Sequence, residues 1–453
     1  MKNPIFGKIQ KFRKNQFFVS VFKVGSGQFI AQAMSLLSVP ILSRIYSDLS
    51  YGDTAIITST ASILINVAAL GLTSAIMKPE DDDEAKIVFT TAAAVNFIIV
   101  TVFVLICALL GHKIELFSVS GSYGLALVIM WMYATLYSMS LLLGVYANRK
   151  KQYDRLFMNP IIGSITNFVI AIPLGLLGFG YEGFMITNII QYLCICVHMM
   201  WGNNPFASHY RFRDFRYVIR TYKEYILFQY PSNFIENFGI EYPTQYLGRV
   251  FTAQQLGGYS LCVRVMQYPI RLIAAPISTV YFRTATEYQR QGKNLAEFTF
   301  KMIRGVLLIS AVPVALFILT SEWLFAFAFG RTWREAGTLA GFLVVQYVLL
   351  FCSQTVSYCR VSIGKQKVNL GVSVVRLVVT AVSCTAGYAL FGDMEPTVLC
   401  FSLGQCAYNI YDMAINFYCM SANKRCLWKY LAISVPYALV MLLLSLAKRY
   451  IIC

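Results

Sequence analysis

The sequence predicts an all-α polytopic membrane protein, built from two six-helix bundles and one additional C-terminal span. Three observations lead to this fold class. The 453-residue chain is 57% hydrophobic and only 13% charged, whereas soluble domains are about 25% charged. Runs of roughly 20 apolar residues, the length that crosses a bilayer core of about 30 Å, recur along the chain. A motif near the N-terminus also occurs a second time, 205 positions later.

The repeated motif marks the first span of each half. Its two copies run from 28–32 (QFIAQ) through 44–46 (RIY) to Gly52, and from 233–237 (NFIEN) through 249–251 (RVF) to Gly257. The interval from the Arg to the Gly is the same in both copies. Six crossings return a chain to its starting side, so the two halves should share an orientation. We therefore predict a pseudo-two-fold axis along the membrane normal, as in other transporters with parallel repeats.

The apolar runs set the predicted spans and domains. The spans lie near 17–42, 54–77, 87–110, 124–146, 156–178, 182–202, 222–247, 256–282, 299–320, 337–358, 369–391 and 397–420, with a thirteenth near 430–447. The last has no counterpart in the repeat. The predicted domains are an N-terminal six-helix lobe (1–210), a C-terminal six-helix lobe (211–427) and an additional transmembrane segment (428–453).

The net charge of +17 is explained by topology. With the N-terminus in the cytoplasm, and with Lys23, Lys223 and Lys301 near the cytoplasmic ends of their spans counted as cytoplasmic, 27 Lys and Arg residues are cytoplasmic, seven lie on the outward side and four lie within spans. The turn 359–368, which includes Arg360, is counted as cytoplasmic. This asymmetry follows the positive-inside rule, so nucleic acid is not an expected partner.

The seventh span is the most polar. Its polar residues recur at helical spacing and so share one face: Asn233, Glu236, Asn237 and Glu241. Such a face is too costly to turn toward lipid. Gln28 and Gln32 form a matching stripe in the first span. We expect these two related helices to line opposite walls of one central cavity.

The eighth span carries a cationic face. Arg264, Tyr268 and Arg271 lie at i, i+4 and i+7, with Gln267 beside them. Arg keeps its charge, and its planar guanidinium matches pairs of phosphate oxygens. We therefore predict that these residues, helped by Arg376 in the eleventh span, bind an anionic headgroup.

Two interpretations of the acidic residues stay open. Glu236 or Glu241 could pair with Arg264 or Arg271 and simply hold two neighbouring spans together. Alternatively, a carboxylate among apolar helices can exchange a proton near neutral pH, which makes both residues candidates for coupling.

Other charged residues also have two interpretations. Arg44 and Arg249, at the outer ends of spans 1 and 7, either anchor the interface or close an outer gate. The acidic run 80–84 is typical of a solvated cytoplasmic turn, with a cation site as the alternative.

No enzyme signature is present. The three His residues and twelve Cys residues lack metal-ligand spacing, and no GxxxxGK[ST] phosphate loop occurs. We therefore predict a protein that is not an enzyme and that needs no metal or other cofactor.

One family resemblance is carried by the first two spans. The segments 38–55 (SVPILSRIYSDLSYGDTA) and 75–86 (AIMKPEDDDEAK) resemble the N-terminal pattern of Wzx-type O-antigen and polysaccharide flippases of the MOP (multidrug/oligosaccharidyl-lipid/polysaccharide) superfamily. The turn 364–367 (GKQK) is similar to a later signature of that family. Asp48-Leu49 stands where the family often has Pro-Glu. Spans 3 to 12 match the family in layout only, so the resemblance does not identify substrate-binding residues in this sequence.

The resemblance implies a MATE-like fold and a specific activity. The substrate would be an undecaprenyl-diphosphate-linked oligosaccharide, an O-antigen or other surface-polysaccharide repeat unit. It would be moved from the cytoplasmic to the outer leaflet of the bacterial inner membrane by alternating access, with proton or sodium coupling left open. Membrane lipid, a polysaccharide polymerase and a chain-length regulator are the other candidate partners.

Two other functions predict different features of the sequence. A cation-coupled multidrug or metabolite exporter of the same superfamily should have an acidic cavity, and the Arg pair of the eighth span argues against it. A membrane polymerase or ligase needs a large outer loop for its catalytic groups, and the predicted outer loops are short.

Overall fold

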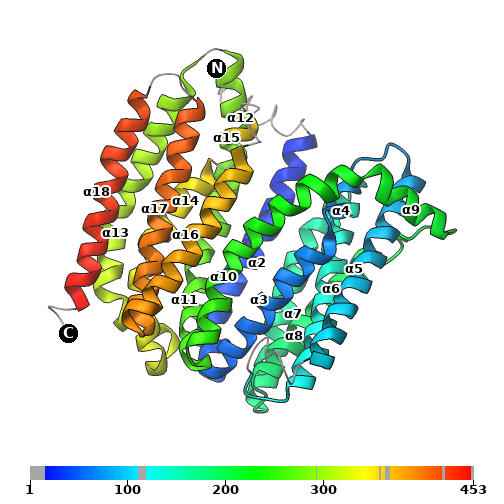
Figure 1. Ribbon diagram of the computed structural model, residues 1–453, viewed down its shortest axis with the longest axis horizontal. Coiled ribbons are helices and arrows are strands. Elements are labelled where there is room, and N and C mark those ends of the chain that lie inside the picture. Colours follow the sequence, from blue (N-terminus) through cyan, green and yellow to red (C-terminus); the bar gives the residue numbers. More distant parts are fainter. Residues whose placement is uncertain are drawn as a thin grey trace, which may run out of the picture. The chain divides into compact units, whose positions relative to one another are not determined.

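The computed structural model describes residues 16–110, 119–291, 293–356, 359–362, 368–420 and 424–449, and their regular structure is helical (Figure 1). The signature turn 364–367 lies outside these ranges. The elements of the first part are α2 (Gln16–Ile45), α3 (Asp48–Ala69), α4 (Leu72–Ala75), α5 (Asp82–Leu110), α6 (Tyr123–Arg149), α7 (Tyr153–Leu176), α8 (Tyr181–Met200) and α9 (Phe212–Thr221). The second part has η1 (Tyr225–Gln229), α10 (Tyr230–Val250), α11 (Ala253–Pro269), η2 (Ile270–Ala274), α12 (Ala275–Arg290), α13 (Leu295–Phe329), η3 (Arg331–Trp333), α14 (Arg334–Thr355), α15 (Cys359–Ser362), α16 (Val368–Phe391), α17 (Met394–Met420) and α18 (Arg425–Ala447).

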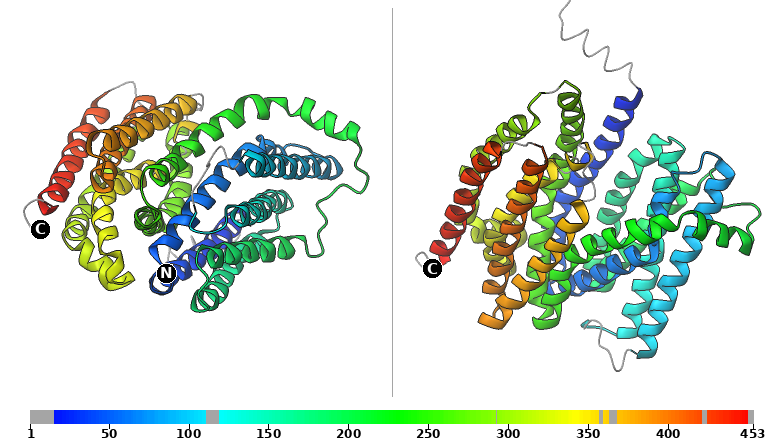
Figure 2. Two further views of the ribbon diagram at one scale, coloured as in Figure 1. Left: turned by 60° about the horizontal axis from the view of Figure 1, so that its bottom comes forward. Right: turned by 45° about the horizontal axis from the view of Figure 1, so that its top comes forward.

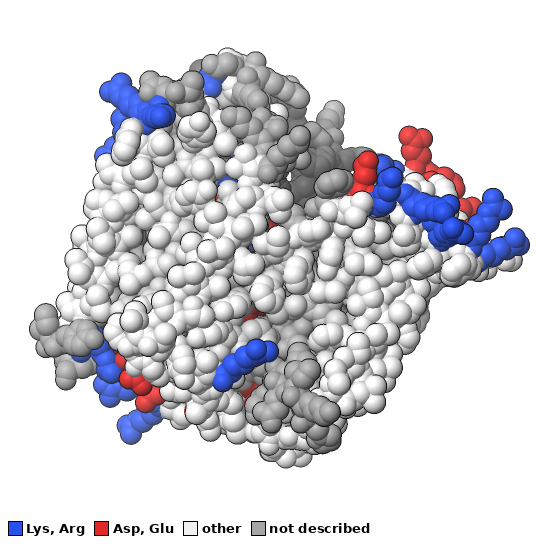
Figure 3. Space-filling view, in the orientation of Figure 1, with Lys and Arg blue, Asp and Glu red and all other residues white. Residues whose placement is uncertain are grey.

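Ten helices of the described residues are long and apolar enough to cross a membrane, which makes this a multi-pass membrane protein. They include α18, which covers the predicted thirteenth span. The other three predicted spans are helical as α10, α11 with α12, and α17, but they are not among these ten. On the face seen in Figure 3, the charged side chains gather mostly near helix ends, with uncharged residues between them.

Several predicted spans are interrupted. The span predicted at 256–282 is divided by the π-helical turn η2, which follows Pro269 directly. Pro lacks the N–H that an α-helix requires, so the hydrogen-bond ladder must change there. The span predicted at 54–77 ends early, because Leu70 (φ 44°) and Gly71 (φ 72°) adopt left-handed backbone conformations. The short helix α4 follows this break.

The chain divides into two compact units, each described by itself. Unit 1 contains Met1–Ile45, Ala61–Leu116 and Gly121–Asn233; unit 2 contains Tyr46–Thr60, Phe117–Ser120 and Phe234–Cys453. Unit 2 thus includes the first half of α3. The predicted boundaries at 210 and 427 rest on the repeat and stay a prediction.

The helices of the two units pack in the same order. In unit 1, α2 packs on α7, α7 on α8, α8 on α6 and α6 on α5. In unit 2, α10 meets α16 where Gly239 approaches the backbone of Leu377, α16 packs on α17, α17 on α14 and α14 on α13. In Figures 1 and 2, α17 (orange) runs beside α18 (red). This recurrence supports the predicted repeat, and the axis that would relate the copies stays a prediction.

The two glycines of the repeated motif lie in one helix crossing within unit 2. A Cβ at Gly52 of α3 would overlap the carbonyl group of Ala253, and a Cβ at Gly257 of α11 would overlap that of Asp48. Asp48 corresponds to Ala253 in the repeat, just as Gly52 corresponds to Gly257. The contact is therefore reciprocal, as in interfaces formed by a two-fold operation.

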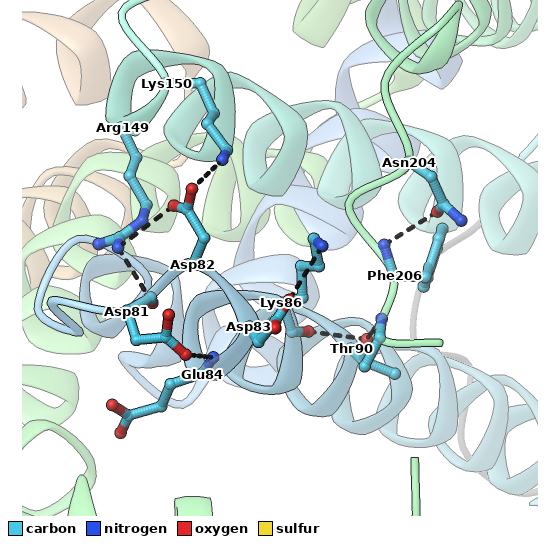
Figure 4. Close-up of polar contacts among 11 residues, drawn as sticks. Asp81, Asp82, Asp83, Glu84, Lys86, Thr90, Arg149, Lys150, Asn204 and Phe206 are labelled. Atoms are coloured by element: carbon cyan, nitrogen blue, oxygen red, sulfur yellow. Dashed lines mark hydrogen bonds and ion pairs between the residues drawn. The ribbon is translucent and has the colours of Figure 1, made fainter. Parts of the chain in front are cut away.

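In unit 1, the acidic run is joined to the turn after α6 (Figure 4). Lys150 Nζ lies 2.5 Å from Asp82 Oδ2, and Arg149 donates hydrogen bonds to the backbone carbonyls of Pro79, Glu80 and Asp81. The carboxylates of Asp82 and Asp83 stay exposed at the N-terminus of α5, where the helix dipole favours negative charge. This arrangement agrees with a solvated turn.

Candidate functional site

A polar, Arg-rich network runs through unit 2. Its first part is at the kink after α11, where Arg271 donates a hydrogen bond of 2.5 Å to Gln267 Oε1, one helical turn earlier. Gln267 also hydrogen-bonds the Tyr347 hydroxyl of α14. Arg271 and Arg376 are both close enough for their charges to act on that hydroxyl. Two of the predicted arginines therefore converge on one Tyr.

Arg264 lies on a neighbouring part of the same helix. Its guanidinium carbon is 5.7 Å from the ring centroid of Tyr51, a cation–π geometry. Tyr268 is buried, and the charges of Arg264 and Arg271 both act on its hydroxyl. Arg264 and Arg271 are exposed, and the binding role predicted for these three residues stays a prediction.

Arg376 extends the network to α17. Its guanidinium carbon is 5.7 Å from the ring centroid of Tyr408. The charged groups near the Tyr408 hydroxyl are Asp412, Arg376, Arg360 and Glu236. Tyr408 therefore lies between the predicted arginine and a second charged pair.

That second pair is a buried ion pair which the sequence analysis missed. Arg360 Nη1 lies 2.7 Å from Asp412 Oδ1, and their side chains are 10% and 7% exposed. The Ser353 hydroxyl donates a hydrogen bond to Asp412 Oδ2. Arg360 was expected in a cytoplasmic turn. The side of the membrane stays a prediction, but Arg360 is not solvated: the short helix α15 places the guanidinium inside the unit, where the Asp412 carboxylate balances its charge.

A signal for this pair was present in the sequence. The buried polar residues of α17 recur at spacings of 4, 3 and 4, on one helix face: Gln405, Asn409, Asp412 and Asn416. Gln405 Nε2 donates a hydrogen bond of 2.7 Å to Thr380 Oγ1, and Asn409 Nδ2 donates one of 2.8 Å to the Gln405 carbonyl. The spacing rule that singled out the seventh span would also have found this stripe.

The two candidate coupling residues lie in α10. Glu236 is exposed and Glu241 is half-buried. Glu236 is among the charges that act on Tyr408, and Glu241 is among those that act on the buried Tyr259. Both carboxylates therefore lie near buried Tyr side chains of unit 2. Whether they couple transport to an ion gradient stays a hypothesis.

The remaining predicted site residues fall into two groups. Asn237 is half-buried in unit 2. Asn233 and Gln28 are exposed and Gln32 is buried, and all three belong to unit 1. The central cavity that residues of both groups were expected to line stays a prediction.

A pocket of about 290 Å³ lies in unit 2, around the crossing of α3 with α11. Asp53 is fully buried in its wall and accepts hydrogen bonds from the backbone N–H and hydroxyl of Ser120. The predicted gate residues Arg44 and Arg249 are both exposed, each in the last turn of its own helix. Burial raises the pKa of the Tyr46 hydroxyl, between α2 and α3, to about 12, so that group stays neutral.

The chemistry that this network favours is anion binding. Arg264, Arg271 and Arg376 supply permanent positive charge beside Tyr hydroxyls and amides, the groups that recognise phosphate or carboxylate oxygens, whereas the charge of Arg360 is balanced by Asp412. Within the described ranges, no group of three or more His, Cys, Asp and Glu side chains could hold a metal ion.

Fold and site together define a class: a multi-pass helical membrane protein with an Arg-rich polar network among its helices. Residues 41–338 match the family model described as "Polysaccharide biosynthesis protein". The chain belongs to this family, which confirms the predicted resemblance. A comparison with curated proteins found no significant match.

Solved structures share the fold. The "Lipid II flippase MurJ, inward closed conformation" aligns with a TM-score of 0.64 at 12% identity, covering 95% of this chain and 99% of that one. An inward-facing "multidrug resistance MATE family transporter of the MOP superfamily" gives 0.62 at 16% identity, covering 89% and 95%. The MATE multidrug transporter DinF-BH gives 0.56 at 17% identity, covering 90% and 95%. The chain therefore shares its fold with these solved membrane proteins.

Proposed function

We propose that this chain is a flippase for an undecaprenyl-diphosphate-linked oligosaccharide, a repeat unit of O-antigen or of another surface polysaccharide. The substrate would move from the cytoplasmic to the outer leaflet of the bacterial inner membrane by alternating access. The N-terminus would lie in the cytoplasm. A polysaccharide polymerase and a chain-length regulator would act on the product at the outer face.

The observation that carries the proposal is the convergence of three arginines of unit 2, of which Arg264 and Arg271 are exposed and Arg376 is half-buried. The charges of Arg271 and Arg376 both act on the Tyr347 hydroxyl, and those of Arg264 and Arg271 both act on the Tyr268 hydroxyl. A diphosphate carries several negative oxygens, which suit bidentate recognition by guanidinium groups. Membership of a polysaccharide biosynthesis family agrees with a glycan attached to that diphosphate.

Membrane physics explains how such a substrate is handled. The polyprenyl tail stays among the lipid chains, since burying it in protein would gain no hydrophobic free energy. Only the charged headgroup must leave water, and a polar cavity replaces its hydration. A proton or sodium gradient would drive the cycle, with Glu236 and Glu241 as the candidate coupling carboxylates.

Loss of the gene tests the proposal in cells. We expect lipid-linked repeat units to accumulate on the inner leaflet and surface glycan to disappear. The measurement is the accessibility of the lipid-linked glycan to an impermeant glycan-modifying enzyme in spheroplasts. Surface glycan at the wild-type level in the deletion strain would refute the proposal.

The Arg271 side chain gives a residue-level prediction. Arg271→Ala is expected to abolish transport, whereas Arg271→Lys should retain part of it, because a lysine keeps the charge and loses only the paired hydrogen bonds. Surface glycan is measured at matched protein level. Equal loss in both variants would show that guanidinium geometry is required, and wild-type glycan in Arg271→Ala would remove this residue from the site.

The second candidate is a cation-coupled multidrug or metabolite exporter. One observation favours it: the fold is shared with MATE multidrug transporters as well as with a lipid flippase. It predicts that deletion raises drug sensitivity and leaves surface glycan intact. The basic network of unit 2 argues against it, since organic cations would be repelled.

A further inference from the structure

The short helix α9 presents a basic face that the proposed transport cycle does not use. Arg213, Arg216 and Arg220 lie at i, i+3 and i+7, so they share one side of α9, and Lys223 follows two residues after the end of the helix. All four are exposed. Within the described part of the chain, no acidic side chain forms an ion pair with any of them. In Figure 3, Lys and Arg side chains gather over the place of α9 in Figure 1.

Side chains opposite and beside the basic face fix α9 to unit 1. Val218 (0% exposed) and Tyr222 (3%) belong to an apolar cluster with residues of α5, α6 and α8. The hydroxyls of Tyr217 and Tyr222 both donate hydrogen bonds of 3.0 Å to Glu84 Oε1, at the start of α5. The basic face is therefore held in place and does not belong to a loose tail.

The chain before α9 is fastened as well. Arg155 donates hydrogen bonds to the carbonyls of Met199 (2.5 Å) and Trp201 (2.6 Å) at the end of α8. The backbone N–H of Ala207 bonds to Thr90 Oγ1 at 2.9 Å (Figure 4 shows Thr90 beside this connection). The connection between α8 and α9 is therefore held against unit 1 by hydrogen bonds.

Large aromatic side chains flank the basic stripe. Phe212 is 81% exposed and Tyr217 is 48% exposed, and they lie on either side of the arginines around the helix. Trp201, at the end of α8, is 76% exposed. Exposed aromatic rings beside Arg and Lys are characteristic of helices that lie at a membrane–water interface.

We propose that this surface binds the headgroups of anionic phospholipids in the leaflet that adjoins α9. Charge complementarity selects this partner: four exposed cations face outward, while the nearby Asp214 accepts the N–H of Arg211 at 2.8 Å and caps the helix. Clusters of Lys and Arg on an amphipathic helix attract anionic lipid in this way. Lipid bound there would fix the connection that leads into η1 and α10, the helix of Glu236 and Glu241.

The experiment uses the full-length protein in detergent, titrated with phosphatidylglycerol or with phosphatidylcholine and read by native mass spectrometry. Wild type is expected to retain phosphatidylglycerol in preference to phosphatidylcholine. R213Q/R216Q/R220Q should weaken phosphatidylglycerol retention by about fivefold for each arginine removed. The matching Arg→Lys variant should retain binding, because the charge is kept.

The control removes three exposed cations of unit 2: K293Q/K301Q/K424Q. It should change phosphatidylglycerol retention by less than about threefold, the scale of an ordinary exposed charge. Equal retention of both lipids by wild type, or an equal loss in the control, would overturn the proposal. Binding of soluble polyglutamate by the wild-type arginines in place of phosphatidylglycerol would also overturn it and would assign the surface to an acidic protein.

Discussion

Asp412→Ala is expected to destabilise the protein by about 3–5 kcal/mol, because it leaves Arg360 as an uncompensated buried charge. The pair is 2.7 Å apart, and Asp412 also accepts the Ser353 hydroxyl hydrogen bond. The substitution removes both the ion pair with Arg360 and the hydrogen bond from Ser353. The measurement is denaturant unfolding of the purified protein in detergent.

Two comparisons separate the pair from a general effect of charge. Asp83→Ala breaks the exposed contact with Lys86 and should change the free energy of unfolding far less than Asp412→Ala does, because solvent screens an exposed pair. The double variant Arg360→Met with Asp412→Leu should recover most of the stability lost in Asp412→Ala, since neither buried charge remains. A double variant as unstable as the single one would contradict the assigned ion pair.

Gly52→Val is expected to prevent accumulation of folded protein. A Cβ at this position would overlap the Ala253 carbonyl, so α3 and α11 would have to separate along their crossing. Gly257→Val should have the same effect, because the contact is reciprocal. The measurement is the yield of monodisperse protein on size-exclusion chromatography after solubilisation.

The matched control is Gly305→Ala in α13, where a Cβ would meet nothing within 4 Å. That change should stabilise by roughly 0.5–1 kcal/mol, since Ala is the better helix former. The double variant Gly52→Val with Gly257→Val should be no worse than either single one, because both open the same interface. Wild-type yield of Gly52→Val would mean that α3 and α11 do not cross there.

Much of the fold was predictable because lipid imposes a simple rule. Apolar runs of sufficient length become helices, and the repeated Arg-to-Gly motif marked the crossing at Gly52 and Gly257. Breaks were less predictable. Leu70 has a left-handed backbone conformation, which leucine rarely adopts, so its residue type did not indicate the break. Pro269 indicated a kink, but the sequence did not show that the turn after it is π-helical.

The candidate site was predictable where polar residues were numerous. Arg264, Tyr268 and Arg271 stood out because they interrupt one span with a regular face. Asp412 did not, since a single carboxylate in a long apolar stretch was not connected with its neighbours Asn409 and Asn416. The burial of Arg360 was not predicted because the four-residue helix α15 is too short to leave a periodic pattern.

The most direct test of the central claim is transport by the full-length protein reconstituted into liposomes. An undecaprenyl-diphosphate-linked oligosaccharide is placed in one leaflet, and its arrival in the other is followed with a lectin that cannot cross the bilayer. The proposed function predicts lectin binding that rises with wild-type protein and stays at the protein-free level with Arg271→Ala. Wild-type liposomes that move an organic cation, while the lipid-linked glycan stays where it was placed, would contradict it.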